Sequence, residues 1–139
     1  RDVAKAQLQA FGQHKDRYGL IHCDLLPQNL LKDGETVRII DFDDCGYGWH
    51  MFDIATYMFL YTFEANAEEV KRAFIEGYRR QRDLSEEQLQ SYDLFMLIRV
   101  MTYCGWVYTR PEAETAQENA ETLAAVVANA PEVYLTKNQ

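Results

Sequence analysis

Two short apolar segments separated by an Asp-Gly pair constrain the fold of this chain more than any other feature. Leu30–Lys32 and Val37–Ile40 flank Asp33-Gly34, and Asp-Gly between apolar runs is a strong signal for a β-hairpin. Asn29 comes directly before the first segment, and Asp41 comes directly after the second. An antiparallel hairpin therefore brings these two side chains next to each other, as a shared metal ion would require.

A second pattern lies just upstream, where residues 22–29 read His-Cys-Asp-Leu-Leu-Pro-Gln-Asn. Asp24, Asn29 and Asp41 then follow in the order in which phosphoryl transfer from ATP uses an Asp, an Asn and a second Asp. The first carboxylate accepts the proton of an attacking hydroxyl, and the other two side chains hold metal ions that neutralise the phosphates. The spacing predicts Asp24 as the catalytic base, and Asn29 and Asp41 as binders of metal and cofactor.

Three carboxylates, Asp41, Asp43 and Asp44, crowd into four positions after the second apolar segment. Such crowding is unfavourable unless water or a cation relieves it. Hard oxygen ligands favour magnesium over zinc or copper. We interpret Asp41 as the main ligand, Asp43 as a second ligand and Asp44 as a solvated side chain.

Two further residues are candidates for structural support of this site. His22 lies two residues before Asp24 and is expected to hold the loop through a structural hydrogen bond. Asp53 is the only charge at the start of an apolar helix. It either interacts with the helix dipole or accepts hydrogen bonds from backbone amides of the Asp24 loop, and the sequence leaves both arrangements open.

Outside the hairpin, apolar periodicity and end signals predict helices, so we expect a mainly α domain that carries a small β-hairpin. The expected elements are helices at 3–18, 51–63, 66–82, 85–109 and 112–129, and loops at 19–27 and 45–50. Gly19 is expected to end the first helix. Asn66 with Glu69, and Ser85 with Gln88, are expected to form capping boxes.

Composition narrows the class of protein. The chain has 139 residues, of which 47% are hydrophobic, enough for one compact domain with a core. Its net charge of −8 argues against nucleic acid or an anionic membrane surface as a partner, and suits a cationic small molecule better. Three widely spaced cysteines and no visible signal peptide favour a reducing cytoplasm as its location.

These residues resemble the aminoglycoside phosphotransferase and choline kinase-like family, a branch of the protein kinase-like fold. The resemblance covers residues 19–58, with Ile21–Asn29, Ile39–Asp43 and Phe52–Ala55 as the matching segments. It implies that Asp24 is the catalytic base, that Asn29 and Asp41 bind magnesium, and that Asp53 steadies the catalytic loop. It also implies a two-lobed enzyme with ATP between the lobes, of which residues 1–139 form the helical C-terminal catalytic lobe.

The chain departs from the protein kinase pattern in two ways. It starts at Arg1, and neither a Gly-rich phosphate loop nor a strand lysine precedes Asp24. We therefore expect a fragment whose N-terminal nucleotide-binding lobe is absent, inactive by itself. The stretch from Asp41 to Asp53 is too short for a long activation loop and lacks an Ala-Pro-Glu motif, which favours a small-molecule acceptor over a protein substrate.

The sequence thus predicts the catalytic lobe of an ATP- and Mg-dependent kinase for a hydroxyl group of a small molecule. The acceptor could be aminoglycoside-, choline- or homoserine-like, and the sequence does not choose among them. Two alternatives are a protein Ser/Thr kinase-like enzyme and a kinase-like binding module without catalysis. The presence of Asp24, Asn29 and Asp41 speaks against the module.

Overall fold

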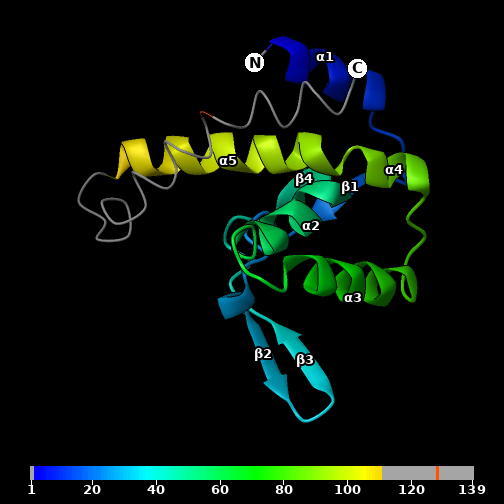
Figure 1. Cartoon of the computed structure of the whole chain (residues 1–139), viewed down its shortest axis with the longest axis vertical. Helices are drawn as coiled ribbons and strands as arrows, with labels where there is room; N and C mark the ends of the chain where they lie inside the picture. The colour runs from blue at the N-terminus through cyan, green and yellow to red at the C-terminus, as the bar shows by residue number, and fades with distance from the viewer. Residues whose placement is uncertain (1, 111–127, 129–139) are drawn as a thin grey trace.

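The computed structural model describes residues 2–110 and residue 128, and helices make up most of this part (Figure 1). The elements are α1 (Asp2–Phe11), β1 (Tyr18–Ile21), the 3-10 helix η1 (Pro27–Asn29), β2 (Leu30–Asp33), β3 (Thr36–Ile39), β4 (Gly46–Trp49), α2 (His50–Phe59), α3 (Ala67–Arg79), α4 (Glu86–Gln90) and α5 (Tyr92–Thr109). The expected fold class, mainly α with a small β-hairpin, is confirmed.

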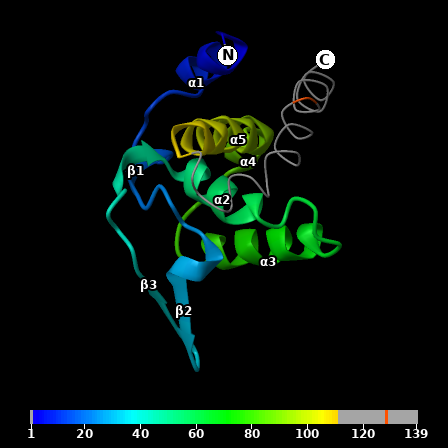
Figure 2. The ribbon, with the colours of Figure 1, turned by 90° about the vertical axis from the view of Figure 1, so that its left-hand side faces the viewer.

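Helix α2 occupies the middle of the helical body, with α5 on one side and α3 on the other (Figures 1 and 2). Its Ile54 and Ala55 are fully buried and share a core cluster with Phe95 of α5 and Ile75 of α3. This explains why α2 is apolar on nearly every face, because a helix covered on two sides has little surface left for water. Helix α1 joins the outer side of α5, where Ala4 packs against buried Leu94.

The β2–β3 hairpin projects away from the helical body (Figures 1 and 2). The two strands are antiparallel, with Leu30 opposite Ile39 and Asp33 opposite Thr36. Gly34 has a φ of 59°, the left-handed conformation that tight hairpin turns require. The hairpin prediction is therefore confirmed.

A second antiparallel pair, β1 with β4, overturns part of the prediction that residues 19–27 and 45–50 are loops, because residues 19–21 and 46–49 are strands. Tyr18 pairs with Trp49 and Ile21 pairs with Gly46. Gly48 suggested a loop, but it and Gly19 lie where close packing favours a glycine. A Cβ on Gly48 would collide with the side chain of Ile21, and a Cβ on Gly19 would lie 2.9 Å from Nε2 of His50.

The ends of three predicted helices also differ from the structure. Helix α1 stops at Phe11 rather than Tyr18, because Gly12 adopts a left-handed φ of 73° and its N–H bonds to the carbonyl of Leu8. Helix α2 ends at Phe59 rather than Phe63, and α3 ends at Arg79 rather than Arg82. Asn66 precedes α3, but its side chain makes no capping bond, so that predicted capping box is wrong.

The Ser85–Gln88 capping box is confirmed by both of its hydrogen bonds, of 3.1 and 2.9 Å. The helix that it begins is broken into α4 and α5 at Ser91, whose hydroxyl donates to the carbonyl of Gln88 at 2.6 Å. A side chain that binds a backbone carbonyl in this way competes with the helical ladder. The predicted helix at 112–129 lies outside the described residues, apart from residue 128. No helix in the described part is long and apolar enough to cross a membrane.

Candidate active site

The loop from Asp24 to Asn29 folds back on itself, so that these two predicted site residues lie together. The Nδ2 of Asn29 donates to the backbone carbonyl of Asp24 at 2.9 Å and lies 3.5 Å from its Oδ2. The turn is shaped by Pro27, which begins η1, while Leu26 before it is extended, as a residue preceding proline prefers. Asn29 is buried, with 7% of its surface exposed.

The hairpin then brings the end of β3 to the start of β2. The backbone N–H of Ile40 donates to the carbonyl of Asn29 at 3.0 Å, directly beyond the Leu30–Ile39 pair. Asp41 follows Ile40 and adopts a φ of 65°. A left-handed non-glycine residue is strained, and such strain is concentrated at functional sites. The backbones of Asn29 and Asp41 are thus neighbours, as the hairpin register predicted.

Asp53 lies in the first turn of α2 and binds the loop that precedes Asp24. Its Oδ2 accepts from the N–H of His22 at 2.7 Å, and its Oδ1 accepts from the N–H of Cys23 at 2.9 Å. Cys23 is left-handed, with a φ of 67°. Burial raises the pKa of Asp53, while the two N–H bonds oppose that rise. Of the two arrangements considered for Asp53, the structure shows the bonds to the loop.

His22 joins the two site segments. Its Nε2 lies 2.9 Å from the carbonyl oxygen of Ile40, the residue before Asp41. The centroid of its ring lies 4.7 Å from the ring centroid of Phe42. His22 is 5% exposed. The imidazole therefore connects the residues before Asp24 with the strand end that carries Asp41.

The remaining carboxylates point to solvent. Asp41, Asp43 and Asp44 are exposed, and no hydrogen bond or ion pair within residues 2–110 links them to Asp24 or Asn29. Among the described residues, no three His, Cys, Asp or Glu side chains gather closely enough to hold a metal ion. A cation at this site would therefore rest on the amide oxygen of Asn29 and on water besides Asp41 and Asp43.

Arg99 of α5 is a site residue that the sequence analysis missed. Its Nη2 lies 3.4 Å from Oδ1 of Asp24, and its side chain is 11% exposed. Burial lowers the pKa of Arg99, while the neighbouring Asp24 acts in the opposite direction. One signal could have revealed it, because Arg99 is the only basic residue in the apolar stretch 92–109.

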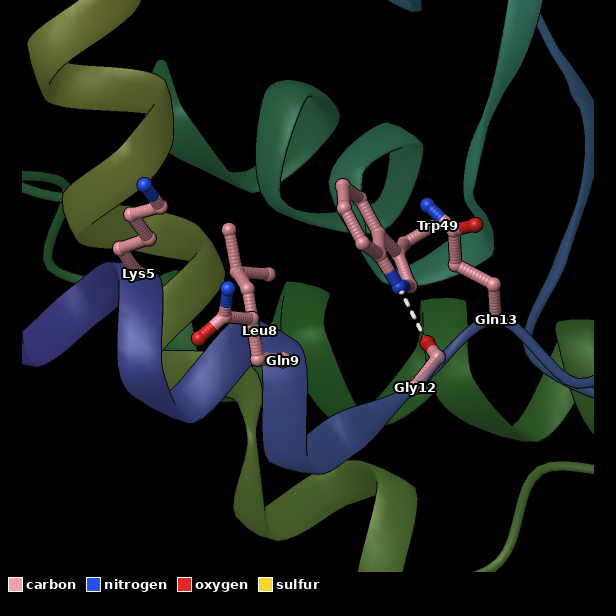
Figure 3. A pocket seen from close by; sticks show the side chains of 6 residues that line it. All are labelled: Lys5, Leu8, Gln9, Gly12, Gln13 and Trp49. Carbon is pink, nitrogen blue, oxygen red and sulfur yellow. Dashed lines mark hydrogen bonds between the residues drawn. The ribbon is translucent and has the colours of Figure 1, made fainter.

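A pocket lies at a different place in the fold, between α1 and the start of α2 (Figure 3). Its lining residues are Lys5, Leu8, Gln9, Gly12, Gln13 and Trp49. The indole N–H of Trp49 donates to the carbonyl of Gly12 at 2.7 Å, which ties β4 to the end of α1 (Figure 3). None of the predicted site residues lines this pocket.

Comparison with known proteins identifies the class. The model of the phosphotransferase enzyme family matches residues 1–92, which include the whole loop, the hairpin and α2. The chain therefore belongs to the phosphotransferase enzyme family.

Individual relatives share this fold. The structure of a microcompartment-associated aminopropanol kinase matches this chain with a TM-score of 0.82 and 31% sequence identity. The match covers 98% of this chain and 43% of the aminopropanol kinase chain. The structure of an amicoumacin kinase in complex with AMP-PNP, Ca2+ and Ami matches with a TM-score of 0.77 and 27% sequence identity. This match covers 96% of this chain and 43% of the amicoumacin kinase chain. The amicoumacin kinase of Bacillus subtilis (strain 168) is 27% identical over 133 residues, which span 89% of this chain and 40% of that protein. The chain thus spans less than half the length of these relatives.

Proposed function

We propose that this chain is the catalytic lobe of an ATP- and magnesium-dependent phosphotransferase that phosphorylates a hydroxyl group of a small molecule. One observation carries this proposal. A single loop, anchored by Asp53, sets Asp24 against Asn29, and the hairpin then sets the backbone of Asp41 beside that of Asn29. A base and two metal ligands need to lie near one another in this order along the chain, which supports the proposal.

In the proposed reaction, the acceptor hydroxyl oxygen forms a bond to the γ-phosphorus of ATP as the bond from that phosphorus to the β-γ bridging oxygen breaks. The carboxylate of Asp24 takes the hydroxyl proton, and ADP leaves with the bridging oxygen. Asp53 supports this step by binding the backbone amides of His22 and Cys23, and His22 supports it by linking the loop to the carbonyl of Ile40.

The donor set fits a hard divalent cation. Asp41 and Asp43 are exposed carboxylates. The Nδ2 of Asn29 makes the bonds to Asp24, and within residues 2–110 no donor is bonded to the Oδ1 of Asn29. Asn29, Asp41 and, secondarily, Asp43 would hold magnesium, which when bound neutralises the phosphate oxygens of ATP.

The acceptor is proposed to be small, and the net charge of −8 favours a cationic one. The relatives named above are kinases of amicoumacin and of aminopropanol. In this chain β4 begins at Gly46, soon after Asp41, which leaves little room for a long peptide-binding segment. We further propose that the nucleotide is held between this lobe and a second lobe of the same protein, and that the 139-residue chain alone is inactive.

The test uses the intact protein that contains this chain. Asp24→Asn is expected to lower kcat by about 10²–10⁴-fold while the Kd for ATP with magnesium stays within about twofold of the wild-type value. Asp41→Asn is expected to weaken that binding by about tenfold or more. Asp33→Asn is the control, because Asp33 is an exposed carboxylate on the same hairpin.

Turnover is measured with a coupled ADP assay, and binding by calorimetry. Near-normal turnover of Asp24→Asn would contradict the role of the base. Unchanged nucleotide binding in Asp41→Asn would contradict the proposed metal site.

A further inference from the structure

Arg99 is a buried cation with few partners. Its side chain is 11% exposed, its Nη2 has one long contact to Asp24, and its Nε has no hydrogen-bond partner among the described residues. The guanidinium carbon also lies 5.9 Å from the ring centroid of Phe59. Burying a charge with so little compensation destabilises a fold, so packing alone does not explain this residue.

Arg17 shows how the same chain buries a structural arginine. Its side chain is 15% exposed and lies 4.8 Å from the ring centroid of Phe11, a setting similar to that of Arg99. Unlike Arg99, it forms ion pairs with Asp16 and Glu87 and donates to the carbonyl of Phe11. Arg17 thus has hydrogen-bond partners at all three guanidinium nitrogens, whereas within residues 2–110 Arg99 has only the long Nη2 contact to Asp24.

The two oxygens of the Asp24 carboxylate have different neighbours. Oδ1 faces Arg99 at 3.4 Å, and Oδ2 faces Asn29 at 3.5 Å. Charge-assisted hydrogen bonds are usually about 2.7–2.9 Å long, so neither oxygen is tightly held.

We propose that Arg99 is a positioning residue for Asp24: its guanidinium attracts Oδ1 and so orients the carboxylate, which leaves Oδ2 to receive the proton of the acceptor hydroxyl. This inference rests on the function proposed above. Arg99 reaches the site from α5, whereas Asp53 supports the loop from α2. One helix thus contacts the side chain of the base, and another holds the backbone amides of the two residues before it.

The test compares Arg99→Met with Arg17→Met in the intact protein. Arg99→Met is expected to lower kcat by about 10–100-fold, as misplacement of a reacting group does, while KM for ATP stays within about twofold. A lowered kcat with an unchanged KM distinguishes misplacement of Asp24 from a general loss of folding. Arg17→Met is expected to lower the thermal midpoint and leave kcat unchanged.

Arg99→Lys is expected to restore part of kcat, because it keeps the charge without the planar fork. If Arg99→Met does not fold, Arg99→Gln takes its place, with the same expected loss. Wild-type kcat in the uncharged variant would overturn the inference. If Asp24→Asn is nevertheless inactive, the proposed function stands; an active Asp24→Asn would overturn both.

Discussion

The two hydrogen bonds from the catalytic loop to Asp53 give the sharpest stability prediction. Asp53→Asn keeps the size of the side chain but replaces one carboxylate oxygen by an NH2 group. One of the N–H groups of His22 and Cys23, now bonded at 2.7 and 2.9 Å, then faces a donor. A hydrogen bond to a charged group contributes about 1.5–3 kcal/mol, and a buried N–H without an acceptor costs about 1–3 kcal/mol.

Relaxation of the left-handed Cys23 offsets about 1 kcal/mol of this loss. We therefore expect the free energy of unfolding to fall by about 2–4 kcal/mol at pH 7. Urea unfolding of the chain measures it, and hydrogen exchange at the amides of His22 and Cys23 localises the effect. Asp33→Asn is the matched control, because its ion pair with Arg38 is exposed and 3.8 Å long, so a loss under about 1 kcal/mol is expected. Equal losses in the two variants, with unchanged exchange at Cys23, would refute this reasoning.

Two further predictions concern stability. Gly48→Ala is expected to lower the free energy of unfolding by about 1–3 kcal/mol, because the new methyl meets Ile21. Gly77→Ala, on α3, is expected to raise the free energy of unfolding by about 0.5–1 kcal/mol, since nothing lies within 4 Å of the added carbon. If urea unfolding shows that both substitutions change this free energy in the same direction, the packing argument is contradicted. Burial, and secondarily Arg82, lowers the pKa of His50, so the unfolded chain binds the proton more tightly. Stability is expected to decline as pH falls below about 6.5. His50→Gln should flatten that decline in thermal melts from pH 7 to 5, and an unchanged slope would show that His50 is not its cause.

Local signals predicted the elements on which the site depends. The Asp-Gly turn fixed the pairing of β2 with β3, and the pairing made the backbones of Asn29 and Asp41 neighbours. The Ser85 capping box was also readable, because its bonds join residues three apart. Signals of this kind act between residues a few positions apart, so they can be recognised in the sequence without knowledge of the fold.

Contacts between distant segments were not readable. Gly48 suggested a loop, yet the β1–β4 pair requires a glycine there because Ile21 packs against it. From the sequence, Asp53 could equally have interacted with the dipole of its own helix. Only the fold shows that it binds the backbone amides of His22 and Cys23. In each case a residue that looked local is explained by a segment about thirty positions away.

The sequence by itself determined the hairpin, the order of Asp24, Asn29 and Asp41, and the mainly helical composition, because these depend on turn chemistry and periodicity. Only the tertiary structure decided which groups hold the loop. Arg99 comes from a helix 75 residues after Asp24, and no spacing rule links two such positions. Their proximity follows from the packing of α5 on α2, which depends on the whole core at once.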